Sequence, residues 1–172
     1  MERGRGRVVL VTGVAGDIGG RFARRIAEDP TVERVVGVDA APPRADLGRV
    51  SFVRADIRNP VIAKVIAGQD VDTVVHLSVA PDRSSPCSGA GSSLGSSLGS
   101  AGSGGASTKE HNVIGTMQLL AACQRAEGLQ RLVVRSSGAV YGSSSRDPAM
   151  FTEDMSAKAP PRGGYAKDVL EV

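Results

Sequence analysis

The sequence contains few aromatic residues and few cysteines. Phe, Trp and Tyr make up 3% of its 172 residues, tryptophan is absent, and there are two cysteines. The chain therefore has few aromatic side chains on which nucleic-acid bases could stack. Its formal charge is only +3 and its basic residues are scattered, so we do not expect nucleic acid as a partner. Cys87 and Cys123 form neither a metal-ligand spacing nor a disulfide framework. We therefore expect no metal site and a reducing, cytoplasmic location.

Long hydrophobic runs are also absent. No apolar stretch approaches the length of a membrane span, and the basic first seven residues are followed by no long apolar region or small-residue cleavage site. The sequence thus predicts neither a membrane segment nor a signal peptide. Its length is sufficient for one domain, 1–172, with a hydrophobic core.

The most informative stretch reads VVLVTGVAGDIGG, from Val8 to Gly20. Its apolar start predicts a strand buried on both faces, and its end predicts the beginning of a helix. Between them lie Gly13, Gly16 and Gly19. A glycine turn that leads into a helix N-terminus favours anions, because free N–H groups and the helix dipole face the ligand and a missing Cβ lets a pyrophosphate approach.

The spacing G-x-x-G-x-x-G is weak evidence alone, but Asp39 strengthens it. Asp39 closes the next apolar run, about twenty residues past Gly19, where an acid would bind the hydroxyls of an adenosine ribose. The two features together predict a dinucleotide site. Asp39 favours NAD, since it would repel a 2′-phosphate, and Arg44 nearby leaves NADP as the less favoured alternative. A P-loop is excluded because no Gly-Lys-Ser/Thr follows Gly19.

Strand and helix patterns alternate along the rest of the chain. This alternation predicts an α/β fold with a doubly wound, Rossmann-type parallel sheet in the strand order 3-2-1-4-5. Residues 84–108 are almost entirely Ser, Gly and Ala, so we expect a flexible insertion there, with an inert loop favoured over a lid. The expected strands are 8–11, 32–39, 50–55, 71–79 and 129–136, and the expected helices are 18–27, 61–67, 109–126 and one that opens at 165.

Several motifs occur in an order typical of one family. Beyond the glycine turn they are Asp56-Ile57, the strand segment VHLSVA (75–80), Asn-Val-Ile-Gly-Thr (112–116) and SSGAVYG (136–142). The sequence resembles the extended short-chain dehydrogenase/reductases, in particular the NAD-dependent epimerase/dehydratase family, from about Val8 onward apart from the Ser/Gly insertion. The resemblance implies hydride transfer with NAD and a nucleotide sugar or another small hydroxylated substrate.

The resemblance also implies roles for individual residues. Ser137 and Tyr165 align with the catalytic pair, in which tyrosine acts as general acid/base and serine bonds the same substrate oxygen. His76 is interpreted as a packed strand-end histidine rather than a base, and Tyr141 as structural. The implied cofactor-binding residues are Gly13, Gly16, Asp17, Ile18, Gly19, Asp39, Asp56, Ile57, Leu77, Ser78, Val79 and Asn112.

Three departures from the family pattern bear on activity. A free tyrosine has a pKa near ~10, and the family lowers it with a lysine four residues later. Here that position is Val169, and Lys167 would lie roughly 200° around a helix from Tyr165. Asp17 is acidic where the family often has an apolar residue, which bears on cofactor affinity.

The third departure is length. The family's later half supplies two more strands and most of the substrate pocket, so we expect a fragment that lacks the substrate domain. The family's dimer helices follow strands four and five, and a homodimer is therefore expected only in a longer protein. We interpret the chain as the NAD-binding portion of an epimerase/dehydratase-type oxidoreductase. The alternatives are a non-catalytic dinucleotide-binding or sensor module, or a hydroxysteroid-dehydrogenase-like reductase.

Overall fold

The computed structural model describes residues 6–79, 109–141 and 150–157, together with Val172. The predicted insertion at 84–108 and the helix expected from 165 lie outside these residues. In chain order the elements are β1 (Arg7–Thr12), α1 (Asp17–Ala27), β2 (Val32–Asp39), β3 (Ser51–Arg54), α2 (Val61–Gly68), β4 (Thr73–His76), the π-helical turn η1 (Glu110–Ile114), α3 (Gly115–Gln124), β5 (Arg131–Val134) and the 3₁₀ turn η2 (Gly138–Tyr141).

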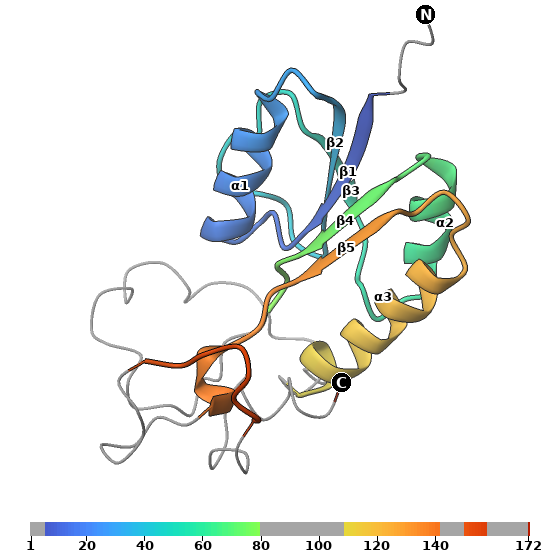
Figure 1. The fold of residues 1–172 in the computed structure, drawn as a ribbon. Helices are drawn as coiled ribbons and strands as arrows, with labels where there is room; N and C mark the ends of the chain where they lie inside the picture. Colours follow the sequence, from blue (N-terminus) through green and yellow to red (C-terminus); the bar gives the residue numbers. More distant parts are fainter. Residues whose placement is uncertain (1–5, 80–108, 142–149, 158–171) are drawn as a thin grey trace, which may run out of the picture.

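The five strands form one parallel sheet in the order β3-β2-β1-β4-β5, which confirms the predicted topology (Figure 1). β1 lies at the centre, and Thr12 at its end is opposite Val38 of β2 and His76 of β4. The carboxyl ends of these strands therefore meet where the chain enters the glycine turn, which is where open α/β sheets bind ligands.

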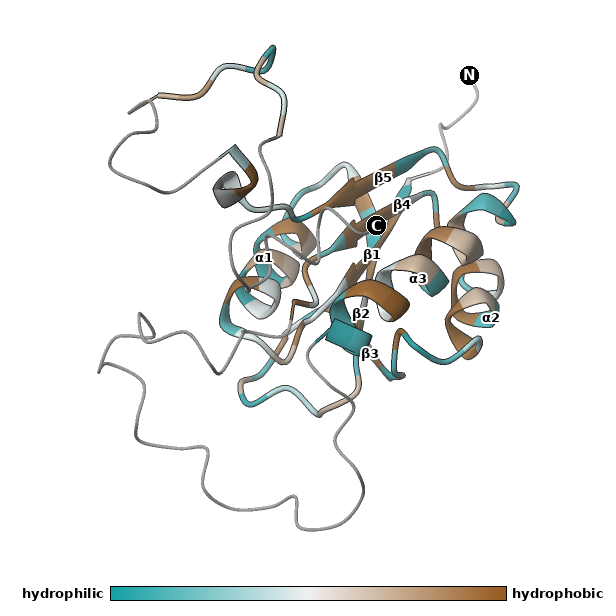
Figure 2. Cartoon of the chain, turned by 90° about the horizontal axis from the view of Figure 1, so that it is seen from below, coloured by the Kyte–Doolittle hydropathy of each residue, from teal (hydrophilic) through white to brown (hydrophobic). Residues whose placement is uncertain are grey.

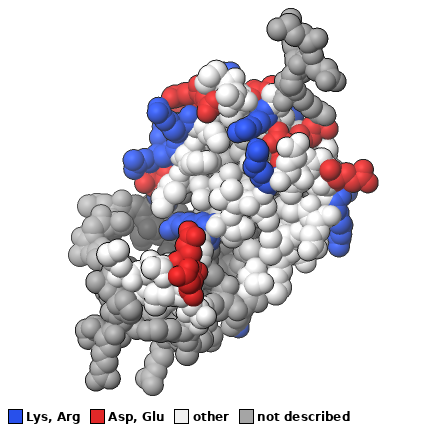
Figure 3. All heavy atoms as spheres, in the orientation of Figure 1, with Lys and Arg blue, Asp and Glu red and all other residues white. Residues whose placement is uncertain are grey.

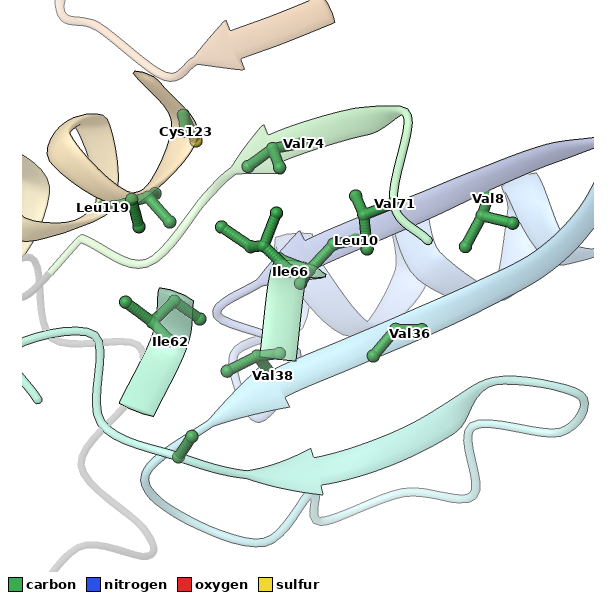
Figure 4. Packing of buried hydrophobic residues seen from close by; sticks show 12 residues of the cluster. Val8, Leu10, Val36, Val38, Ile62, Ile66, Val71, Val74, Leu119 and Cys123 are labelled. Carbon is green, nitrogen blue, oxygen red and sulfur yellow. The ribbon is translucent and has the colours of Figure 1, made fainter. Parts of the chain in front are cut away.

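Both faces of the sheet are covered, as the alternation of β1 requires. Val8 and Leu10 belong to a core cluster with α2 and α3, whereas Val9 and Val11 belong to a second cluster with α1. Figure 2 shows the hydrophobic strands between α1 on one side and α2 and α3 on the other, and Figure 4 shows the first cluster. Leu10 and Val11 are fully buried, so β1 cannot shift its register without exposing this core.

The start of α2 shows the capping chemistry that is typical of Asn followed by Pro. The side-chain oxygen of Asn59 accepts the N–H of Val61 at 3.0 Å, and Pro60 already has a helical φ of −55°. Proline fits there because the first turn of a helix has no partner for its missing N–H.

Several predicted boundaries are too long. The strand expected over 71–79 spans only Thr73–His76, and the strand expected over 129–136 spans Arg131–Val134. The helix expected over 109–126 divides into η1 and α3, which ends at Gln124. Apolar patterns continue past these ends, but a parallel strand ends where its neighbour no longer offers ladder partners.

β5 is one edge strand of the described sheet, and its side chains other than that of Leu132 are exposed. Val133 is 52% exposed and Val134 40%. Figure 3 shows a largely uncharged surface on the side of the molecule where Figure 1 places β5 in front. Within the described residues, no helix is long and apolar enough to span a bilayer.

Candidate functional site

Three glycines shape the turn between β1 and α1, and their roles differ. Gly13 has φ +82°, and a Cβ there would lie 2.7 Å from the backbone nitrogen of Ser78. A Cβ on Gly19 would overlap the carbonyl oxygen of Gly13. At Gly16 the nearest atom to an added Cβ is the same oxygen, at 3.3 Å. Gly13 and Gly19 therefore fix the backbone, while Gly16 leaves the helix N-terminus open.

The first turn of α1 offers backbone N–H groups and one acid. Gly16 precedes the helix and supplies no side-chain cap, so the positive end of the helix dipole is available to an anion. Ile18 is 53% exposed beside it. Asp17 lies 3.4 Å from Arg21, one helical turn on, which partly offsets its charge. Both side chains are largely exposed, so this pair contributes little to stability.

Asp39 is fixed at the end of β2 by two backbone hydrogen bonds. One carboxylate oxygen accepts the N–H of Ala15 in the glycine turn at 3.0 Å, and the other accepts the N–H of Ala41 at 3.0 Å. A carboxylate oxygen has a further lone pair, so the group retains acceptor capacity. The structure therefore brings Asp39 and the glycine turn together, as the sequence predicts.

Asp56 and Ile57 follow β3 but differ in environment. Asp56 accepts hydrogen bonds from Nε of Arg58 at 3.0 Å and from Nη2 at 2.6 Å, and these bonds hold the pKa of Asp56 below its ordinary value. The side chain of Ile57 is buried, and a Cβ on Gly115 would lie 2.8 Å from it. Arg58, which the sequence analysis did not single out, thus orients the acid at this edge.

Leu77, Ser78 and Val79 follow β4 as a half-buried segment. The backbone N–H groups of Leu77 and Ser78 donate to the hydroxyl of Thr12, at 3.2 and 3.3 Å. This hydroxyl takes over from the strand ladder, which explains why β4 ends at His76. The segment is held against the end of β1, beside the glycine turn.

His76 lies inside a buried hydrogen-bond chain. Its Nδ1 is 2.7 Å from the Thr12 hydroxyl and its Nε2 is 3.1 Å from the Thr116 hydroxyl, which donates to the carbonyl oxygen of Asn112 at 2.5 Å. His76 is 1% exposed, and burial lowers its pKa to about 4. It is therefore a packed neutral histidine, in agreement with the sequence interpretation.

The donors and acceptors of this chain define one tautomer. Because Thr116 gives its proton to Asn112, it accepts from Nε2–H of His76. Nδ1 then accepts the proton of Thr12, whose oxygen receives the two backbone N–H groups. Each side chain of this hydrogen-bond chain therefore has both a donor and an acceptor partner, the histidine through its two ring nitrogens. The bonds join β1, β4 and α3 at the carboxyl edge of the sheet.

The π-helical turn η1 carries Asn112 and, just before it, His111. Asn112 is 2% exposed. Nε2 of His111 lies 3.0 Å from the hydroxyl oxygen of Ser78, so η1 contacts the segment after β4 directly. π-Helical turns are rare and concentrate at functional sites. His111 is not among the residues predicted from the sequence, where only its position next to the Asn-Val-Ile-Gly-Thr motif could have indicated it.

The predicted catalytic pair is only half described. Ser137 is half-buried after β5, and its carbonyl oxygen accepts the N–H of Val140 in η2. Tyr141 stacks on Phe151 with ring centroids 5.6 Å apart, which supports its structural interpretation. Tyr165, like Lys167 and Val169, lies outside the described residues.

Two cavities lie at different distances from the carboxyl edge of the sheet, where the glycine turn is. One of about 490 Å³ lies between α1 and the loop after β2, with Gly16, Arg21 and Arg44 in its lining. A larger one of about 670 Å³ lies at the opposite, amino edge of the sheet, among Arg7, Asp72 and neighbouring residues. Only the first adjoins the glycine turn, so size alone does not identify the candidate site.

A known protein family matches most of the chain. A model of the family described as GDP-mannose 4,6 dehydratase matches residues 10–167. An uncharacterized protein of Mycobacterium bovis is 47% identical over 170 residues, and UDP-glucose 4-epimerase 3 of Oryza sativa subsp. japonica is 30% identical over 186. These alignments cover 96% and 99% of this chain but 41% and 44% of the relatives, so the chain spans less than half their length.

Solved structures share the fold over a similar extent. The dTDP-glucose 4,6-dehydratase of Bacillus anthracis, solved with NAD, superposes with a TM-score of 0.69 at 24% identity, covering 96% of this chain and 47% of that one. A short-chain dehydrogenase/reductase superfamily protein of Agrobacterium tumefaciens, also with NAD, gives 0.67 at 25% identity, covering 96% and 42%. The strand order and two-sided helix cover therefore belong to a known architecture.

Proposed function

The chain belongs to the GDP-mannose 4,6 dehydratase family, and from this premise we propose that it is the dinucleotide-binding part of an NAD-dependent nucleotide-sugar epimerase or dehydratase. The observation that carries the proposal is the bond between Asp39 and the N–H of Ala15, which places an oriented carboxylate beside the open turn at Gly16. Two similar solved structures, the dTDP-glucose 4,6-dehydratase of Bacillus anthracis and the protein of Agrobacterium tumefaciens, contain NAD and support the cofactor. That dehydratase and the UDP-glucose 4-epimerase 3 of Oryza sativa subsp. japonica support the substrate class.

We further propose NAD rather than NADP as the cofactor. Asp39 would accept the ribose hydroxyls, and its charge would oppose a 2′-phosphate in the same place. Arg21 and Arg44 line the neighbouring cavity, but Asp39 is the group that two backbone N–H groups hold in position. The preference is therefore assigned to Asp39.

Calorimetric titration tests the cofactor and its preference together. Asp39→Ala is expected to weaken NAD binding by about tenfold or more, since hydrogen bonds to a charged group contribute roughly 1.5–3 kcal/mol. Asp39→Asn is the matched control, because it keeps an acceptor for Ala15 and removes the charge. Asp39→Asn should lose less NAD affinity than the alanine variant. It should also discriminate less against NADP than the parent chain does, because the charge that opposes the 2′-phosphate is gone. Equal NAD affinity in all three proteins would contradict the role of Asp39.

We propose Ser137 and Tyr165 as the catalytic pair, on the strength of the family motifs. Val169, in place of the family's lysine, favours the alternative of a non-catalytic dinucleotide-binding module. A protein of the relatives' length separates the two, with turnover of sugar nucleotides as the measurement. A catalyst is expected to lose at least about a hundredfold in kcat on Tyr165→Phe while keeping NAD affinity, because general acid/base groups contribute about 10²–10⁴-fold. Absence of turnover in a protein that binds NAD would favour the module.

Exposed apolar side chains on η1 and α3, which follow each other directly, support the proposed homodimer of the longer protein. Ile114 and Met117, one turn apart on η1 and α3, are 48% and 47% exposed. Large apolar side chains exposed together on a helix favour a contact with another surface. A second copy is the partner that the family resemblance implies.

A further inference from the structure

His111 is a titratable group at the candidate site that the proposed function does not yet use. It is half-buried in the first turn of η1, with Nε2 3.0 Å from the Ser78 hydroxyl. Ser78 is itself held in place, because its N–H donates to Thr12 at 3.3 Å. The Ser78 hydroxyl, on a residue held in place by its backbone, therefore contacts a side chain that can change its protonation.

Charged groups from two neighbouring segments, the end of β2 and the turn after β3, act on this ring. Burial is the main cause that lowers the pKa of His111, while the charges of Asp56 and Asp39 oppose it and Arg58 adds to it. His76, on β4, is held neutral by burial. Glu110 precedes His111 on η1, and its charge acts on Arg58. The imidazole thus lies within electrostatic reach of the acids that end β2 and β3, at the same edge as the glycine turn.

In the tautomer whose neutral ring carries its proton on Nδ1, protonation at Nε2 reverses the bond with Ser78. An unprotonated Nε2 accepts the hydroxyl proton of Ser78, which is then unavailable to a ligand. A protonated Nε2 donates to the serine oxygen, and the hydroxyl proton is released toward another acceptor. Phosphates and ribose hydroxyls of a dinucleotide present such acceptors, and the phosphates also attract the imidazolium charge.

We propose that His111 is a positioning residue of the dinucleotide site, which turns the Ser78 hydroxyl toward the bound dinucleotide when its ring is protonated and so couples binding to uptake of a proton. This inference rests on the proposed function. It adds a residue and a pH dependence to the NAD site.

The sign of the effect follows from linkage. In the free chain the pKa of His111 lies below its ordinary value of 6.5, so the ring is mostly neutral at pH 7. Anionic phosphates raise that pKa in the complex, so NAD binds more tightly as the pH falls toward the free pKa. One charge-assisted hydrogen bond at a half-exposed position predicts a gain of about tenfold between pH 8 and pH 5.5.

The test is NAD titration by calorimetry from pH 5.5 to pH 8, in two buffers of different ionisation enthalpy that report proton uptake. His111→Gln is the informative variant, because its amide N–H₂ can donate to Ser78 but cannot titrate. It should bind NAD at pH 8 at least as tightly as the parent chain, take up no proton and lose the gain at low pH. His111→Leu, which has no donor, should bind more weakly than His111→Gln at every pH.

Proton NMR gives a second readout, because the chain contains only two histidines, His76 and His111. Loading with NAD should raise the titration midpoint of the His111 ring and leave the His76 signal in place. An unchanged pH dependence in His111→Gln, or no shift of the His111 midpoint, would overturn this inference while NAD binding stands. Failure of the folded parent chain to bind NAD at any pH would overturn the proposed function and this inference together.

Discussion

Replacing Gly19 with alanine is expected to destabilise the fold by about 3 kcal/mol and to abolish dinucleotide binding. The added Cβ would overlap the carbonyl oxygen of Gly13, a backbone atom that cannot rotate away, so α1 must shift relative to β1. Forced overpacking costs roughly 1–3 kcal/mol, and a backbone clash lies at the upper end. In a domain of this size the melting temperature should fall by roughly 10 °C. Urea and thermal unfolding followed by circular dichroism measure both quantities.

Two other glycines provide matched controls for this variant. Gly68 at the end of α2 has nothing within 4 Å of an added Cβ, so Gly68→Ala should leave stability unchanged or raise it by up to about 1 kcal/mol. Gly16 has a φ of −81°, and an added Cβ would be 3.3 Å from the Gly13 oxygen. Gly16→Ala should therefore stay within about 1 kcal/mol of the parent and still lose NAD affinity, since its side chain would stand in front of the helix N-terminus. A stable Gly19→Ala protein would contradict the geometry of the turn.

The glycine turn and the individual strands could be predicted because they follow from local patterns. The run from Val8 to Val11 alternates between two cores, and the glycines follow it without interruption. At the start of α2, Asn59 accepts the N–H of Val61 two residues later, and Asn followed by Pro is a local pattern typical of a helix start. In the glycine turn and at this helix start, the residues that interact lie within a few positions of each other. A short stretch of sequence therefore contains both partners, and the interaction can be predicted from it.

The ends of the strands and the contacts of the site depend on residues far apart in the chain. Thr12 ends β4 by accepting the N–H groups of Leu77 and Ser78, which lie 65 and 66 residues later. His111 reaches Ser78 across 33 residues. No local periodicity contains these pairings, because they arise only when the carboxyl ends of neighbouring strands meet. The sequence therefore indicated the glycine turn after β1 and the place of Asp39 at the end of β2, but not the side-chain contacts that join these segments.

His76→Leu is expected to cost about 3–5 kcal/mol, because it removes one hydrogen-bond partner from each of two buried hydroxyls. Thr12 loses the acceptor of its proton, and Thr116 loses the donor to its oxygen. Each buried unsatisfied polar group costs roughly 1–3 kcal/mol, and leucine also fills the space of the ring imperfectly. His76→Gln retains one polar contact and should lie between the parent and the leucine variant. A double-mutant cycle with Thr116→Val should give a coupling energy of at least about 1 kcal/mol.

The same histidine makes stability depend on pH in a predictable direction. Its pKa is about 4 in the folded chain and about 6.5 when unfolded, so between these values the unfolded state binds more protons. Stability therefore falls as the pH is lowered from 6.5 to 4, by roughly 3 kcal/mol in total, and is fully present above 6.5. His111, whose pKa is also lowered by burial, titrates in the same direction, so the difference between the parent and His76→Leu isolates the His76 part. The variant's deficit should shrink as the pH approaches 4, and a deficit that stays constant with pH would show that the ring is not held neutral by its buried hydrogen bonds.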